Sequence, residues 1–355
     1  MKWMVAALLI FSSESALANA LDQLRHSVFK IHVTSRDPKF NSPWQKERPS
    51  SSGGTGFYIG DGRIMTNAHV VANATYLAVQ RDGASEPTPA YVDFVGHDCD
   101  LAILKVKDEN FFRGVRSMKF GQIPSLRSPV ATIGFPTGGE QVSITEGVVS
   151  RVGFRRYVHD GAARHILIQV DSAINPGNSG GPVVQGRKVV GVAFQAFTQA
   201  ENTGYIIPTP VVRRFLKDVE DGTYDGHPEH GVYTEEWTMM NPSNQNFHGL
   251  GPDDGGVKVV HVAEYAPTSG ILKAGDILLA INGRPIGVDG KVTFKGERVD
   301  FRAVYDLALH GDIVNFTLMR NTERRANASF CMRWQTPKTH FPIRLSITIL
   351  RQAGQ

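Results

Sequence analysis

The strongest constraint on the fold of this chain is a long succession of short apolar segments separated by turn residues. The first is a hairpin pattern, in which residues 56–59 and 63–66 flank the turn Asp61-Gly62. Many short strands at close spacing predict an all-β sandwich or barrel, and two six-stranded barrels would account for their number. Further segments of strand length lie at 76–80, 90–95, 101–106, 130–135, 141–152, 165–170, 183–184, 188–194 and 204–207.

The flanks of this region have different patterns. Residues 21–33 predict a short helix followed by a strand, and the polar, Pro-, Ser- and Gly-rich residues 34–54 predict a surface loop. Pro210 and apolar residues at helical spacing predict a helix at 209–220. Residues 223–228 then read as a linker to a second unit at 229–334, with an amphipathic helix at 300–310, and residues 335–355 form a tail.

Composition excludes several functional classes. The chain has 355 residues and a formal net charge of +4, and no stripe of Lys and Arg accompanies that charge. A nucleic-acid partner is therefore not expected. No Cys/His cluster has the spacing of a zinc site, so neither a metal nor another cofactor is expected. The two cysteines, Cys99 and Cys331, fall in different predicted domains and should remain free thiols.

The N-terminus has the pattern of a secretory signal peptide. Lys2 precedes a short apolar run, and two Ala-x-Ala sites follow at 16–18 and 18–20. A buried N-terminal helix is the alternative. We therefore predict a signal peptide at 1–20, an exported protein that is most simply periplasmic, and a mature domain that begins at residue 21.

A glycine-rich turn is the first candidate for chemistry. It reads Asn175-Pro176-Gly177-Asn178-Ser179-Gly180-Gly181-Pro182. Glycine accepts positive φ angles, and proline limits how such a turn can relax. Successive N–H groups in this kind of turn can converge on a developing negative charge. Ser179 is therefore placed where a nucleophile is needed, although an ordinary tight turn has the same pattern.

A nucleophilic serine needs a base and a group that orients the base. His69 lies where a predicted hairpin passes into a tight turn, and Asp100 directly precedes the apolar strand 101–106. Asp98 is a competing acid, but Asp100 abuts the strand and should be more buried. The chain order His, Asp, Ser is that of the chymotrypsin-like β-barrel proteases.

These segments resemble the catalytic motifs of the HtrA/Deg serine proteases, over residues 53–320 and most closely in the branch with plant-organelle Deg proteases. The motif segments are 66–71, 100–106 and 177–182, with further similarity at 134–136, 145–150 and 204–208. The resemblance implies a chymotrypsin-like double β-barrel protease domain at 21–222. It also implies an ATP-independent endopeptidase that degrades unfolded or misfolded polypeptides and assembles as a homotrimer or a multiple of it.

The resemblance assigns a role to each site residue. Ser179 would be the nucleophile, His69 the general base and then acid, and Asp100 the residue that orients His69. The backbone of Gly177 and Ser179, with Asn178 nearby, would form the oxyanion hole. Trypsin-like enzymes have Asp six residues before the serine, where this chain has Ala173. A pocket lined by Ala173, Ile174, Ala196 and Phe197 would therefore prefer apolar side chains on the residue before the scissile bond.

Regulation is expected from a loop at 153–163, where Arg155 or Arg156 would match the family's relay arginine. Two solvated arginines are the alternative. The stretch 266–283 resembles the central part of a PDZ domain, which implies one PDZ domain at 229–334 that binds a peptide beside a sheet edge. Its carboxylate-binding nest should lie at Glu229, His230, Gly231 and Val232, although His230 replaces the usual apolar residue.

A second functional hypothesis is a peptide-binding chaperone or scaffold with an idle triad. The presence of His69, Asp100 and Ser179 in the family's order favours the protease. An adhesin or lectin sandwich would leave the three motifs without an explanation.

Overall fold

The computed structural model describes residues 21–42, 44–137, 139–196, 203–235, 241–252, 254–321, 325–332 and 348–349. The predicted signal peptide at 1–20 and the tail from 335, apart from 348–349, lie outside these residues. The chain forms two compact units that divide between Tyr224 and Asp225. Among the described residues, no helix is long and apolar enough to cross a membrane.

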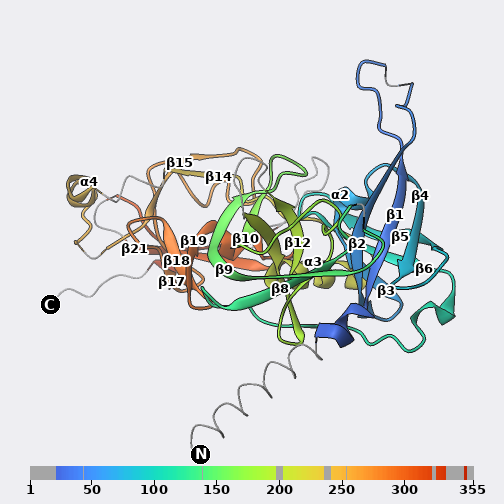
Figure 1. Cartoon of the computed structure of the whole chain (residues 1–355). Helices are drawn as coiled ribbons and strands as arrows, with labels where there is room; N and C mark the ends of the chain where they lie inside the picture. The colour runs from blue at the N-terminus through green and yellow to red at the C-terminus, as the bar shows by residue number, and fades with distance from the viewer. Residues whose placement is uncertain are drawn as a thin grey trace, which may run out of the picture. The chain divides into compact units, whose positions relative to one another are not determined.

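The first unit begins with a closed barrel of six strands (Figure 1). Alternating residues of β1, among them Phe29, Ile31 and Val33, are buried in its core. The short helix α2, Ala68–Val71, follows β3 and buries Val70 and Val71 in the same core. In barrel order the strands are β1 (Val28–Ser35), β2 (Ser50–Gly60), β3 (Arg63–Thr66), β6 (Leu101–Val106), β5 (Thr88–Gly96) and β4 (Ala74–Arg81).

A second six-stranded ring follows, closed by the pairing of β11 with β12. The two rings confirm the predicted pair of barrels. The strands in order are β11 (Pro182–Gln185), β8 (Pro129–Gly134), β9 (Ser143–Arg156), β10 (Arg164–Val170), β13 (Gly204–Pro208) and β12 (Lys188–Ala196), with β7 (Lys119–Phe120) added beside β12. The helix α3, Thr209–Asp218, confirms the helix expected there, and the 3-10 helices η1 and η2 cover Glu109–Phe112 and Val219–Asp221.

The second unit is a twisted antiparallel sheet with short helices. β14 lies at one edge of this sheet, so one side of its backbone has no strand partner within the described residues. The sheet order is β14 (Val232–Glu235), β15 (Val257–Val262), β16 (Ile277–Ile281), β20 (Ile313–Met319), β21 (Arg325–Cys331) and β22 (Thr348–Ile349), with β17 (Arg284–Pro285) on β16. The remaining elements are α4 (Pro242–Phe247), α5 (Arg302–Asp306) and the hairpin β18 (Lys291–Phe294) with β19 (Glu297–Asp300).

Two local predictions were wrong, and one hairpin was not predicted. Residues 50–54 are part of β2 and not a loop, because their backbone pairs with residues 31–35 of β1. The helix expected at 300–310 is only the five residues of α5, because Asp300 ends β19 and the Ala308 N–H closes a turn onto the carbonyl of Tyr305. The β18–β19 hairpin was not foreseen, although Lys295 and Gly296 both take the positive φ that a tight turn requires. Cys99 and Cys331 are free thiols, as expected.

Candidate active site

Thr55 of β2 holds the glycine-rich turn that carries Ser179. Its hydroxyl donates to the carbonyl of Gly177 at 2.7 Å and accepts from the N–H of Phe135 at 2.9 Å. Its own N–H donates to the carbonyl of Ser179 at 2.9 Å. Thr55 is fully buried, so these bonds are shielded from water. One side chain of the first barrel thus fixes the turn of the second, and nothing in the Gly-Gly-Thr-Gly sequence distinguishes it beforehand.

The backbone of the turn has a defined orientation at Gly177. The N–H of Asn178 bonds the carbonyl of Asn175 at 3.0 Å, and Gly177 has φ +97°, which together describe a type II turn. A side chain at Gly177 would meet the carbonyl oxygen of Phe135 at 2.4 Å, so only glycine fits.

The carbonyl of Pro176 accepts from the N–H of Thr137 at 2.7 Å. Because a trans peptide is planar, the N–H of Gly177 points the opposite way, away from Thr137. This is the direction that an oxyanion donor needs. Asn178, predicted as part of the oxyanion hole, uses its N–H within the turn, which leaves the N–H groups of Gly177 and Ser179 as the candidate donors.

Asp100 contacts His69 twice. One carboxylate oxygen accepts from the backbone N–H of His69 at 2.7 Å, and the other lies 2.6 Å from His69 Nδ1. Asp100 is fully buried, whereas the His69 side chain is 32% exposed. Asp100 has φ +51°, a conformation that Asp accepts more readily than most residues, and its carbonyl receives the side-chain amide of buried Asn67.

The competing acid has a different environment. A carboxylate oxygen of Asp98 accepts from the Tyr224 hydroxyl at 2.5 Å and from the N–H of Cys99 at 2.9 Å. Burial is the main cause that raises the pKa of the Cys99 thiol well above its usual range, with the Asp98 charge second. The structure therefore brings Asp100, and not Asp98, to His69.

Two glycines allow the Ser179 turn to approach the segment that bears His69. A side chain at Gly180 would meet Thr66 Oγ1 at 2.2 Å and the N–H of Asn67 at 3.1 Å. A side chain at Gly54 would meet both Val70 and the carbonyl of Ser179. The Ser179 hydroxyl donates to the carbonyl of Phe194 at 3.3 Å, and in the described part of the chain no hydrogen bond joins it to His69. For attack, the hydroxyl must leave this carbonyl and turn to its base.

Two of the four predicted pocket residues, Ile174 and Ala196, lie beside Gly204. Ile174 is buried, and its side chain leaves no room for one at Gly204. Ala196 pairs with Gly204 at the end of β12, and Ala173 is exposed. Phe197 lies outside the described residues.

The predicted regulatory loop is shorter than expected. Residues 153–156 belong to strand β9, because they pair with β10, and only 157–163 form the connection. Arg155 and Arg156 are both exposed at the end of β9. No contact within the described residues distinguishes one of them as a relay residue.

In the second unit, His230 bonds the backbone within the predicted carboxylate nest. Its Nδ1 accepts from the N–H of Val232 at 2.9 Å, and its ring packs on Tyr305 with centroids 4.0 Å apart. Burial, with repulsion from Arg302 second, lowers the pKa of His230 to about 4. Gly231 has φ +65°, and Ala266 leaves no space for a side chain there. Glu229 is exposed.

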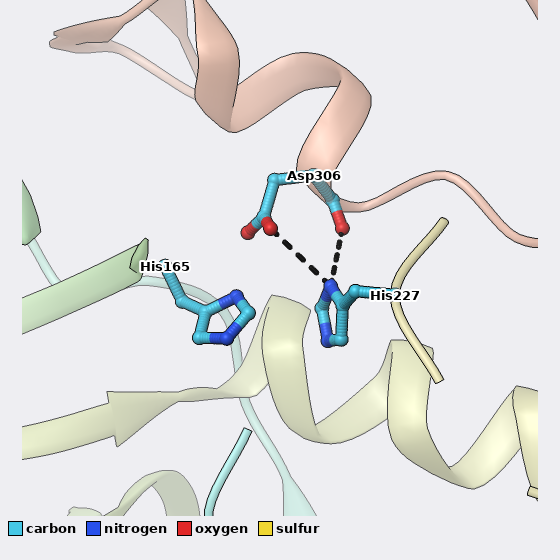
Figure 2. Close-up of side chains that lie close together, drawn as sticks. All are labelled: His165, His227 and Asp306. Atoms are coloured by element: carbon cyan, nitrogen blue, oxygen red, sulfur yellow. Dashed lines mark hydrogen bonds and ion pairs between the residues drawn. The ribbon is translucent and has the colours of Figure 1, made fainter. Parts of the chain in front are cut away.

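A second histidine fixes the segment that leads into this nest. His227 Nδ1 lies 2.9 Å from the carbonyl oxygen of Asp306 and 3.2 Å from its carboxylate (Figure 2). These contacts join the segment before β14 to the end of α5. The segment before β14 and the short helix are therefore held together.

Comparison with known proteins shows which family this chain resembles. Residues 54–192 match the trypsin-like peptidase domain family. The mitochondrial Protease Do-like 4 of Arabidopsis thaliana is 39% identical over 312 residues, which cover 87% of this chain and 60% of the relative. The chloroplastic Protease Do-like 2 of the same plant is 38% identical over 305 residues, which cover 84% of this chain and 50% of the relative. This chain thus spans only half to three-fifths of these relatives.

Solved structures show the same fold. The HtrA-type protease AlgW with tripeptide has a TM-score of 0.68 and 24% identity, and the match covers 90% of this chain and 98% of that one. The serine endoprotease from Yersinia pestis has a TM-score of 0.56 and 19% identity, with 94% and 98% covered. The peptidase-domain match, the Do-like relatives and the chymotrypsin-like double barrel together show that this chain belongs to the HtrA/Deg family of serine proteases.

Proposed function

We propose that this protein is an ATP-independent serine endopeptidase that works through an acyl-enzyme. The observation that carries the proposal is the double contact of buried Asp100 with His69, beside the turn that bears Ser179. This contact fixes the imidazole so that Nδ1 keeps its proton and Nε2 remains a base. It also stabilises the imidazolium that forms when the base takes a proton.

The reaction follows from these positions. Ser179 Oγ attacks the scissile carbonyl while His69 Nε2 takes its proton. The carbonyl oxygen becomes an oxyanion, which accepts hydrogen bonds from the N–H groups of Gly177 and Ser179. His69 then gives the proton to the leaving amine, and the C–N bond breaks. Water repeats the sequence on the ester, which returns the proton to Ser179.

The substrates that we propose are unfolded or misfolded polypeptides with an apolar side chain before the scissile bond. The absence of a carboxylate at Ala173 and the buried Ile174 support an apolar pocket. Because one methylene changes binding by only about 1–3 kcal/mol, the preference should be broad.

We propose that the second unit is a PDZ domain that binds peptides. The unpaired edge of β14 offers backbone groups for an added strand, and the glycine at 231 allows the tight turn of a nest. The matched HtrA-type structure was solved with a tripeptide, which is consistent with a peptide ligand in this family.

Location and assembly are also proposals. The Ala-x-Ala pattern supports an exported protein, and in a bacterial cell this would place it in the periplasm. The curated relatives are named as mitochondrial and chloroplastic enzymes, so an organelle is the competing location. A homotrimer is proposed from the family resemblance, and light scattering of the purified full chain would test it.

Casein digestion distinguishes the peptidase hypothesis from the chaperone hypothesis. Wild-type protein should degrade casein without ATP, and Ser179→Ala should not. Cleavage by both proteins, or by neither with aggregation of a denatured client still suppressed, would contradict the peptidase and favour the idle-triad chaperone.

A further inference from the structure

Two histidines outside the triad meet beside His69. His97 Nδ1 lies 2.8 Å from His159 Nε2, and the two rings have centroids 5.1 Å apart. The His159 ring is in turn 6.0 Å from the His69 ring. The two histidines are 62 residues apart in the sequence, so no local sequence motif predicts their contact.

Both histidines lie in segments whose backbone is held by turns and hydrogen bonds. His97 begins the four-residue turn that ends with Asp100. His159 lies in the connection 157–163, which buried Tyr157 anchors through its hydroxyl to the carbonyl of Ile166 at 2.7 Å. Asp160 closes the same connection by accepting the N–H groups of Ala162 and Ala163 at 2.7 and 2.8 Å. The meeting of the two rings therefore does not depend on a loosely held loop.

We propose that His97 and His159 form a Zn²⁺ site that inhibits the enzyme by placing positive charge next to His69. Imidazole nitrogens are preferred zinc ligands, with Zn–N distances of about 2.0–2.1 Å. In a tetrahedral site two such nitrogens lie about 3.3 Å apart, so the pair has to open by roughly half an ångström. The hydrogen-bonding proton moves to the other nitrogen of its ring, and water fills the remaining positions.

The charges around the pair favour a cation. Asp100 and Asp160 both act electrostatically on His159, whereas His69 and His97 are its other titratable neighbours. Neutral imidazole is the form that ligates a metal, and both rings present a nitrogen to the same point. The exposed His97 ring leaves the site open to solvent.

Inhibition follows from the charge that His69 must acquire. In the proposed reaction His69 becomes an imidazolium, which Asp100 stabilises. A dication on the neighbouring ring opposes that charge and lowers kcat. This inhibitory effect rests on the proposed peptidase function, whereas the metal site itself does not.

Binding is tested on the catalytically inactive Ser179→Ala protein, so that its outcome does not depend on proteolysis. Calorimetric titration with ZnCl₂ should show a binding event that disappears when either His97→Ala or His159→Ala is added. His32→Ala is the matched control, because His32 bonds Gln80 on the first barrel and should leave binding unchanged. An isotherm with the same stoichiometry in all variants, or no binding in any, overturns the site.

Inhibition is tested on the active enzyme with a chromogenic peptide. Saturating ZnCl₂ should reduce kcat at least about tenfold, with recovery on addition of EDTA. The His97→Ala and His159→Ala enzymes should keep their basal rate and lose this sensitivity. Zinc binding at the pair that leaves kcat unchanged overturns the inhibitory role, and an inactive wild-type protein refutes the proposed function while the calorimetry still decides the site.

Discussion

The N–H of Thr137 donates to the carbonyl of Pro176 at 2.7 Å, and this bond turns the N–H of Gly177 toward the opposite side of the peptide. The turn that bears Ser179 is thus held with its candidate oxyanion donor already presented.

Replacement of Gly177 by alanine should strongly reduce activity and destabilise the turn. A Cβ would clash with the backbone of Phe135 and Thr137, and the positive φ would be strained. We expect kcat to fall by at least 10²-fold, the typical effect of losing one oxyanion donor. Gly186→Ala is the control, because it has φ +58° and open space, so it should lower stability by only about 1 kcal/mol and leave kcat unchanged.

Replacement of Asp100 and of Asp98 by asparagine should show which of the two acids orients His69. Asn accepts the positive φ of Asp100 but cannot hold the same His69 tautomer, so kcat should fall by about 10⁴-fold with the melting temperature little changed. Asp98→Asn should instead disturb the Tyr224 contact and affect stability more than kcat. Comparable losses of kcat in the two variants would refute the assignment of Asp100.

Thr55→Val should show how much the first barrel contributes to the active turn. It removes the hydroxyl that bonds Gly177 and Phe135, and two buried backbone groups lose their partner. Each costs about 1–3 kcal/mol, and kcat should fall as well because the turn loosens. Thr75→Val is the control, because its hydroxyl bond is exposed, and chemical denaturation should place it within about 0.5 kcal/mol of wild type.

Part of the fold and of the candidate site could be predicted from the sequence. The barrels, α3 and the His, Asp, Ser order follow from local patterns and chain order. Thr55 and the His97–His159 pair could not be foreseen, because their partners are distant in the chain and no periodicity marks them. The extent of α5 was overestimated, because a turn at Ala308 ends the helix where the amphipathic pattern continues.

His230 should make stability depend on pH. Its pKa is lowered from 6.5 to about 4 in the folded state, first by burial and then by Arg302, against an opposing Asp306. Between these values the unfolded chain binds a proton that the folded chain excludes, so stability is complete above pH 6.5 and is lost as the pH falls toward 4. The full shift corresponds to about 3 kcal/mol, and partial exposure of the ring reduces our expectation to about 1–2 kcal/mol.

His230→Asn tests this dependence, because the Asn oxygen can accept from the N–H of Val232 without titrating. We expect wild type to lose more stability than this variant between pH 7 and pH 4.5, measured by urea denaturation on a Ser179→Ala background. Parallel losses in both proteins would show that His230 is not the responsible group.

The central claim is that His69, Asp100 and the Gly177 turn together activate Ser179 as a nucleophile. It is tested most directly by intact-mass measurement after treatment with a fluorophosphonate, which labels only an activated serine. The account predicts one adduct per chain, located at Ser179 by peptide mapping and absent from Ser179→Ala and Asp100→Asn. A wild-type protein that remains unlabelled, or that is labelled equally in these variants, would contradict it.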